Sequence, residues 1–509
     1  MAEEQSNVTN GISGTNLYGR RVIYATNENI TVDNIVSEVN SALSIHQQNH
    51  TEEERLYWYR RGLVPVLQRK KERNSYVLNK IVENHAGAIV DFKNGYFLTQ
   101  PAFYKARKNA AQSKVEKLNE YLYRSGKQQV DNEIADWFHT VGKAALFVQS
   151  VDSEETPFEV YTLDPRSAFV VYSLRPGNKP IMGVTVVANG DKILIDVYTE
   201  SNIFHLEGAT IGNTITDTPN KPVSAYTVKS VERNTLGLIP IVEYAYNSVN
   251  MSAFEAVIPL LDAINTLQSN RVDGVEQAIQ SLIIATNADL RNKDGSEASA
   301  EDVRKSGLLL LSSKDGNQSK IDILSENLNQ TDTQTLVDDV YERVLTICAM
   351  PSTTKGGSST SDTGAAVLYR DGWYQADCCA RNTGDLFKKS NRQFDRIMLK
   401  ILREKGLLDI AETDFELEFV RNETANVQSK AQAFQTLLAA GMHPELAAAK
   451  SGISNDPVSD IKRSEKYLRL VWGDPDKVDE QEEKGNGQGE AVIVEQTPVI
   501  DENGTDGSV

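Results

Sequence analysis

Two helical segments separated by a polar loop of small residues, at positions 331–374, constrain this chain more than any other feature. The first segment is amphipathic and stops at Pro351. The stretch from Ser352 to Ser361 has no apolar side chain, so it cannot bury itself in a core, and its glycine pair leaves the backbone free. A long helix follows from Ala365, capped by Asp362 or Thr363. The pattern predicts a moving part that contacts something polar; the alternative is an ordinary interhelical linker.

The chain is long enough for several domains, since 509 residues at about 150 per domain predict roughly three. Its 40% hydrophobic and 24% charged residues are typical of a soluble globular protein. No apolar run approaches the roughly 18 residues that span a bilayer, and the N-terminus lacks a signal peptide. We therefore expect synthesis and use in a cytoplasm, without membrane contact. Cys378 and Cys379 are adjacent, which is the wrong spacing for a zinc knuckle or a redox pair.

The net charge of −18 is concentrated at the C-terminus. From Trp472 to Val509 there are 11 acidic residues against two lysines, a net of −9. This tail is also rich in Gly, Gln and Asn and is predicted to be disordered. The rest of the chain is still acidic, which argues against tight, salt-dependent DNA binding through a basic face.

Residues 31–250 predict helices followed by a mostly antiparallel sheet, after a loose arm over residues 1–30. Apolar spacing predicts helices at 33–47, 52–61 and 77–92, and two more between 110 and 141. Short β-branched or aromatic runs predict strands at 144–151, 158–163, 168–172, 181–187, 192–198 and 239–244.

The pattern returns to helix at residue 254. Side chains at steps of three and four form a heptad-like stripe that is apolar except at Gln268. Its members are Leu261, Ile264, Gln268, Val272, Val275, Ile279 and Leu282. Opposite them lie Asp262, Asn270, Asp273, Glu276 and Gln280. A helix at 331–350 returns antiparallel to the first.

Between these two helices the sequence predicts a small mixed module. It contains a strand at 282–286, a helix near 300–305 and a hairpin that joins 308–311 to 321–324. Beyond the long helix, a strand at 415–420 precedes helices at 427–440, 444–450 and 460–470.

No enzymatic motif survives inspection. The run Lys355-Gly356-Gly357-Ser358 lacks the order of a phosphate-binding loop, and no carboxylate helper follows His46 and His50 for a metal site. Tyr57, Trp58 and Tyr59 lie beside arginines and would stack on bases or, as the more common alternative, pack at a boundary. We predict no catalytic residue, no metal and no cofactor.

In the order and spacing of its motifs, the chain resembles the portal proteins of long-tailed bacteriophages over residues 50–470. The motifs that carry the resemblance are Tyr59-Arg60-Arg61-Gly62 followed by Arg69-Lys70-Lys71, Asn79 to Asp91 leading into Gly95-Tyr96-Phe97-Leu98, Tyr161-x-Leu163-Asp164-Pro165, Met350-Pro351 through the loop to Thr363-Gly364-Ala365-Ala366, Glu418-Phe419 with Ala440-Gly441, and Ser454 to Asp460.

The resemblance implies an α+β portal fold that forms a ring. Its parts would be a sheet-rich wing (31–250), stem helices (251–285 and 331–350), a clip (286–330), a tunnel loop (351–364), a long wing helix with a strand (365–423) and a helical crown (424–471). Nothing is carried over to the arm (1–30) or the acidic tail (472–509).

The resemblance also implies a function. Twelve subunits would form a channel at one capsid vertex of the virion, through which double-stranded DNA is packaged and later ejected. The ring, assembled in the host cytoplasm, would dock the large terminase subunit, then head–tail connector proteins, and would contact the major capsid and scaffolding proteins. Two alternatives remain: a scaffold or adaptor that docks partner helices without DNA, and an enzyme acting on nucleic acid with an unfamiliar site.

Three sets of candidate site residues follow. Loop residues would face the DNA: Ser352, Thr353, Thr354, Lys355, Gly356, Gly357, Ser358 and Ser359. Stem carboxylates would line the channel and repel phosphates, or else merely solvate an exposed face: Asp262, Asp273, Glu276, Asp338, Asp339 and Glu342. Clip residues would mediate assembly and docking: Leu308, Leu309, Leu310, Ile321 and Ile323.

Overall fold

The computed structural model divides the chain into two units, Met1–Thr424 and Ala425–Val509. Predictions for the loop from Thr353, for the helix near 300–305 and for the acidic tail fall outside the residues that the structure describes. The described residues are 19–71, 77–107, 111–152, 156–190, 192–209, 226–279, 282–286, 288–291, 310–313, 320–324, 330–352, 372–419, 427–454, 457, 460–464 and 467.

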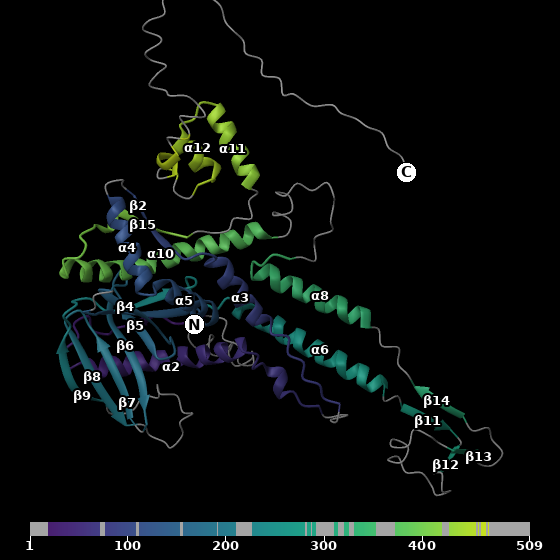
Figure 1. Cartoon of the computed structure of the whole chain (residues 1–509). Coiled ribbons are helices and arrows are strands. Elements are labelled where there is room, and N and C mark those ends of the chain that lie inside the picture. The colour runs from purple at the N-terminus through teal and green to yellow at the C-terminus, as the bar shows by residue number, and fades with distance from the viewer. Residues whose placement is uncertain are drawn as a thin grey trace, which may run out of the picture. The chain divides into compact units, whose positions relative to one another are not determined.

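A six-stranded sheet of order β1-β5-β6-β7-β8-β9 lies in the first unit (Figure 1). The β1–β5 pair is parallel and the other pairs are antiparallel. Helix α2 (Ile35–Arg60) packs on this sheet because its apolar side chains join the buried side chains of the strands in one core. The strands are Ile23–Tyr24 (β1), Ala168–Tyr172 (β5), Pro180–Asn189 (β6), Lys192–Tyr198 (β7), Asn202–Ala209 (β8) and Thr227–Arg233 (β9).

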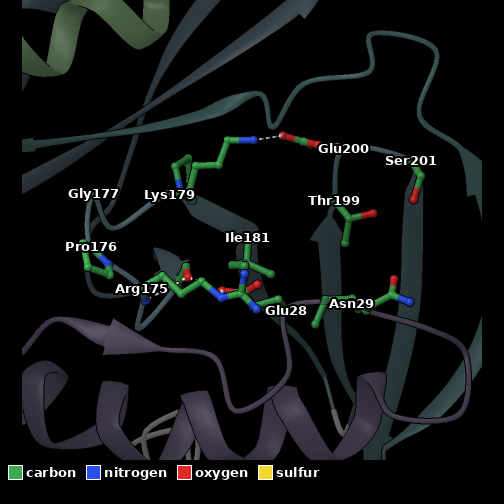
Figure 2. A pocket seen from close by; sticks show the side chains of 13 residues that line it. Glu28, Asn29, Arg175, Pro176, Gly177, Lys179, Ile181, Thr199, Glu200 and Ser201 are labelled. Carbon is green, nitrogen blue, oxygen red and sulfur yellow. Dashed lines mark hydrogen bonds and ion pairs between the residues drawn. The ribbon is translucent and has the colours of Figure 1, made fainter.

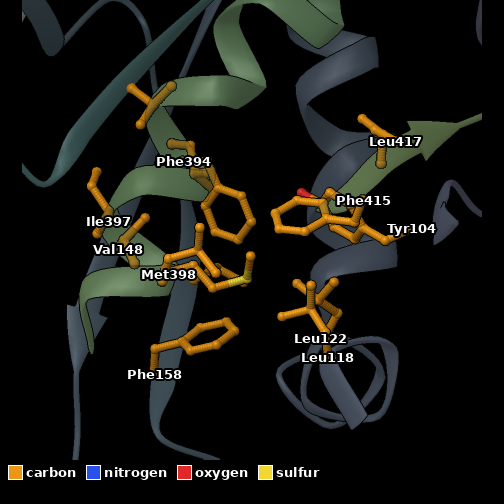
Figure 3. Close-up of a cluster of buried hydrophobic side chains, with 14 of the residues drawn as sticks. Tyr104, Leu118, Leu122, Val148, Phe158, Phe394, Ile397, Met398, Phe415 and Leu417 are labelled. Carbon is orange, nitrogen blue, oxygen red and sulfur yellow. The ribbon is translucent and has the colours of Figure 1, made fainter. Parts of the chain in front are cut away.

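A second core surrounds the three-stranded antiparallel sheet β10-β3-β4 (Figure 3). Aromatic side chains from α10 and from the β2–β15 pair fill it, Phe394 and Phe415 among them. The elements are α3 (His85–Phe97), β2 (Phe103–Ala106), α4 (Gln112–Arg124), α5 (Lys127–Val141), β3 (Lys143–Ser150), β4 (Phe158–Leu163), β10 (Ile241–Ala245), α10 (Trp373–Glu404) and β15 (Phe415–Glu418).

The segment from Gly19 to Ile30 belongs to the folded core, so the prediction of a loose arm is wrong for these residues. Ile23 and Ile30 are buried, and Arg20 forms a buried ion pair with Glu255. These contacts join residues far apart in the sequence, which is why local composition did not reveal them. Residues 1–18 lie outside the described part of the chain.

Two antiparallel helices, α6 (Ile258–Ile279) and α8 (Gln330–Ile347), lie side by side (Figure 1). A two-stranded ribbon connects them. β11 (Leu282–Thr286) pairs with β14 (Lys320–Leu324), and β12 (Ala288–Arg291) pairs with β13 (Leu310–Ser313). The predicted hairpin between 308–311 and 321–324 is therefore wrong. Strands β11 and β12 follow α6, and strands β13 and β14 precede α8. Each strand of the second set pairs with one of the first set, and not with its own neighbour in the sequence.

The second unit contains α11 (Val427–Ala439) and α12 (Pro444–Ser451), and residues 460–464 are helical. Ala447 and Ala448 of α12 are fully buried. These helices lie close to the ranges that the sequence predicts.

Helices and sheets together fit the predicted α+β class, and most strands begin and end within two residues of their predicted bounds. Three helix predictions are wrong. The long helix predicted from Ala365 begins only at Trp373, because Gly372 before it has a left-handed φ of +84°. The predicted helices at 33–47 and 52–61 form one continuous helix, α2, whose polar middle is buried. The predicted helix at 77–92 begins only at His85, where the Asn84 side chain accepts a hydrogen bond from the Gly87 amide at 3.2 Å.

Candidate functional site: the α6–α8 pair and its strap

Residues 77–84, which we call the strap, run in extended form along α6 and bind it through polar groups. Three side chains of α6 accept hydrogen bonds from alternate strap amides. Asn265 accepts from Glu83 N at 2.8 Å, Ser269 from Ile81 N at 3.0 Å, and Asp273 from Asn79 N at 2.7 Å. All three acceptor residues are at most 2% exposed.

The spacing of these bonds has a simple geometric cause. Residues four apart on a helix are separated by about 6 Å along its axis, at about 1.5 Å per residue. Residues two apart on an extended chain are separated by about 6.6 Å, at about 3.3 Å per residue. The two repeats nearly coincide, so one polar stripe of α6 holds alternate amides of the strap in a fixed register. In a helix, the amides of residues 79, 81 and 83 would donate to carbonyl groups of their own segment. Here they donate to side chains of α6, so the strap is extended instead of helical.

Asp273 is the most heavily bonded member of the stripe. Arg69 Nη1 lies 3.1 Å from its Oδ2, Lys71 forms a second ion pair, and Asn79 Nδ2 donates to its Oδ1 at 2.9 Å. Burial opposes ionisation, but Lys71 and the two donors of Asn79 outweigh it, so the pKa of Asp273 is lowered. The carboxylate therefore faces cations of its own chain.

Removing this carboxylate tests the strap. We expect Asp273→Ala to lower the free energy of unfolding by about 2–3 kcal/mol, because it removes charged hydrogen bonds from the partly buried backbone amide and side chain of Asn79. Asp338→Ala, on the exposed face of α8, is the matched control and should change it by less than about 0.5 kcal/mol. Urea denaturation of both variants gives the comparison, and equal losses would rule out the strap as a structural clamp.

The other stem carboxylates differ in exposure. Asp262 is half-buried and accepts a hydrogen bond from Tyr59 Oη at 2.8 Å; burial raises its pKa. Glu276, also half-buried, accepts from Asn79 Nδ2 at 2.9 Å. On α8, Asp338 and Asp339 are exposed and Glu342 is half-buried. Asp339 pairs with Arg343 at 3.2 Å. Within the subunit, the stem carboxylates that are exposed to solvent therefore lie mainly on α8.

The apolar stripe of α6 is buried at only one end. Leu261 and Ile264 are at most 1% exposed, whereas Val272 and Val275 are 40% and 43% exposed. Val272 and Val275 are therefore not covered within the subunit, whereas the strap covers the polar side of α6. Helix α8 also exposes two apolar side chains, Leu336 at 48% and Ile347 at 56%.

The remaining predicted site residues are only partly described. Ser352 is half-buried, while Thr353 to Ser359 fall outside the described residues, as do Leu308 and Leu309. Leu310 lies in β13 opposite Arg291. Ile321 and Ile323 lie in β14 opposite Ala285 and Ile283. The ribbon therefore contains three of the five predicted clip residues.

The aromatic and histidine candidates have structural roles. The guanidinium groups of Arg61 and Arg166 each lie 4.0 Å from the centre of the Tyr57 ring, and Tyr59 is buried. Of this aromatic run only Trp58 is exposed, at 41%. His46 stacks on Phe169 at 4.3 Å. Within the described ranges, no group of three His, Cys, Asp or Glu residues is placed to hold a metal ion.

A groove of about 490 Å³ lies where the β5–β6 and β7–β8 connections meet the segment after β1 (Figure 2). Its charged side chains pair with one another: Arg175 with Glu28 at 3.0 Å, and Lys179 with Glu200 at 3.8 Å. The other lining side chains, Ser173, Thr199 and Ser201 among them, add hydroxyls and apolar surface. Ser173 also donates its hydroxyl to Glu28, so the charged side chains that line the groove are engaged within it.

The polar clusters of the first unit hold helices and extended segments in register. The chain belongs to the family of phage portal proteins of the SPP1 Gp6-like type. The sequence model of this family matches residues 41–469. This match confirms the resemblance seen in the sequence. The family is structural and non-enzymatic, and its members associate with the capsid as oligomeric rings. No curated protein matches the chain. None of the described helices is long and apolar enough to cross a membrane.

Proposed function

We propose that twelve copies of this chain form a ring at one vertex of the capsid, and that double-stranded DNA is packaged and later ejected through its central channel. Membership of the portal family supports this proposal. The observation that carries it is the set of apolar side chains left open on α6 and α8, since a helix pair with unpartnered apolar surface needs a neighbour, and a closed ring supplies one by heterologous contact.

Assembly gives the most direct test. Negative-stain microscopy of the purified chain is expected to show rings with a central hole. Val272→Asp with Val275→Asp should weaken the rings while leaving the subunit folded, because both side chains are exposed in it. Globular monomers of the parent chain at micromolar concentration would contradict the portal proposal and favour a scaffold that docks partner helices.

The channel wall in this proposal is acidic. Its best candidates are Asp338, Asp339 and Glu342 of α8, with Glu276 of α6, because they reach solvent in the subunit. Asp262 and Asp273 contribute less, since Tyr59 binds the first and cations surround the second. A wall of carboxylates repels phosphates and lets the duplex slide without lasting contacts.

The ribbon is the proposed docking module. A two-stranded ribbon is marginally stable alone, so we expect neighbouring subunits to complete it around Leu310, Ile321 and Ile323. The large terminase subunit and later the head–tail connector would dock there. In the same scheme, residues 31–250 and the long helix form the wing, α6 and α8 form the stem, and residues 424–471 form the crown. The assembled ring would contact the major capsid and scaffolding proteins.

The loop at 351–364 is proposed to meet the DNA. Each copy offers hydroxyls and one cation, Lys355, which can meet a phosphate as a flexible point charge. We expect Lys355→Ala to leave folding and ring assembly unchanged but to alter packaged DNA per particle, measured with the purified motor. Gly356→Pro with Gly357→Pro should reduce packaging more strongly by restricting the backbone. If both variants package and retain DNA like the parent, the loop is only a linker.

A further inference from the structure

A buried polar network joins α10 to two strands of the first unit, β2 and β10. Tyr104 of β2 donates its hydroxyl to Asp395 of α10. Asn391, one turn earlier on α10, donates to Tyr104 Oη at 2.7 Å and to Asp395 Oδ1 at 3.0 Å. Tyr244 of β10 donates to Asn391 Oδ1 at 2.9 Å. Asp395 is 6% exposed, and Asn391 and the two tyrosines are also buried.

The surroundings of Asp395 are poorly suited to a charge. Apolar side chains fill the adjoining core, with Phe394 and Met398 on α10 facing Tyr104 and Phe415 (Figure 3). Other ionisable groups act on it from the neighbouring elements: Lys127 and Asp131 of α5, which pair with each other, and Glu412 after α10. Lys127 favours ionisation of Asp395, whereas the two carboxylates oppose it. Tyr104 also favours ionisation, because it donates to the carboxylate.

A small cavity adjoins the network and gives water a place beside it. Its volume is about 50 Å³, and Tyr104, Lys127 and Asp131 are among the residues that line it. A water molecule occupies about 30 Å³ of liquid, so the cavity has room for one between polar walls. Of the network, Tyr104 lines this cavity.

We propose that Asp395, Tyr104 and Asn391 form a proton-dependent latch, which seats α10 against the sheet while Asp395 is protonated and loosens it when Asp395 ionises. The proposal is independent of ring formation and of DNA. It gives α10, the helix that follows the loop at 351–364, a response to pH near neutrality.

The direction of the response follows from linkage. Burial raises the pKa of Asp395 to about 7, against 3.8 for an unperturbed carboxyl. The folded state therefore holds the proton more tightly than the unfolded state. The stabilisation is fully present below pH 3.8 and is lost as the pH rises through about 7.

Hydrogen exchange of the intact protein tests the latch. Amide protection in α10 around residues 391–402, corrected for intrinsic exchange rates, should fall at least about tenfold between pH 6 and 8.5. Asp395→Asn should remove this pH dependence, because the amide stays neutral. Asp385→Asn, an exposed position on the same helix, is the matched control and should behave like the parent.

Two variants move the midpoint in opposite directions. Tyr104→Phe removes a donor to the carboxylate and should raise the midpoint, whereas Glu412→Gln removes a like charge and should lower it. Glu412 lies near the surface, so its variant keeps the test available if Tyr104→Phe fails to fold. Protection that does not vary with pH in the parent, or that varies equally in Asp395→Asn, would overturn the proposal.

Discussion

Gly142→Ala is expected to destabilise the protein by more than about 4 kcal/mol. Gly142 ends α5 with a φ of +96°, outside the range that side chains with a Cβ adopt readily. A Cβ at this position would lie 2.0 Å from the carbonyl oxygen of Asn250. The cost of the strained backbone and the cost of the overlap add, because the segment around Asn250 cannot easily move away. It is packed between Gly142 on one side and Gly19 on the other.

Gly190→Ala provides the control for backbone strain alone. Gly190 also has a positive φ, +64°, but a Cβ added there would have no atom within 4 Å. We expect this variant to cost about 1–2 kcal/mol. The two variants are compared by urea denaturation and by soluble yield. Equal losses would mean that the segment at 249–251 moves aside, and that the junction it forms with α5 is not rigid.

Glu255→Ala has the second largest expected effect, a loss of about 3–5 kcal/mol. Glu255 precedes α6, and its Oε1 lies 2.6 Å from Arg20 Nη2, with both side chains fully buried. Its removal leaves the guanidinium in the core, where the Val141 carbonyl still accepts a hydrogen bond from it at 3.2 Å but carries no counter-charge. An uncompensated buried charge is costly, because it has lost its hydration without gaining an opposite charge.

A double variant separates the two causes of this loss. Arg20→Met with Glu255→Met removes both charges and keeps apolar volume, so it should lose much less than Glu255→Ala alone. The exposed pair of Asp339 and Arg343 is the control, and Arg343→Ala should change the free energy of unfolding by about 0.5 kcal/mol or less. A double variant as unstable as the single one would show that packing, rather than the unpaired charge, dominates.

Gly19 and Arg20 show what the sequence missed at the N-terminus. Composition placed them in a loose arm, since polar and small residues dominate that stretch. Their stabilising contacts are with Val249 and Glu255, more than 200 residues away. No local pattern carries such pairing, so the arm and the core could not be separated before the structure was known.

The sequence by itself determined the portal family and most of the helices and strands, although β1, β2, β8, β9 and β12 were not predicted. Strands such as Phe158–Leu163 and Lys192–Tyr198 were predicted to the residue, because alternating burial on a sheet leaves a period of two in the sequence. The polar loop and the motifs around it identified the family, because their order and spacing survive in the chain itself.

Only the tertiary structure decided which polar residues are buried. Asn265, Ser269 and Asp273 look like the solvent side of α6, yet they hold the strap, while Val272 and Val275 are exposed. A polar group can be buried wherever a distant partner satisfies its hydrogen bonds, and the periodicity of one helix contains no information about that partner. The network around Asp395 arises in the same way, from residues of three elements that meet only when the chain has folded.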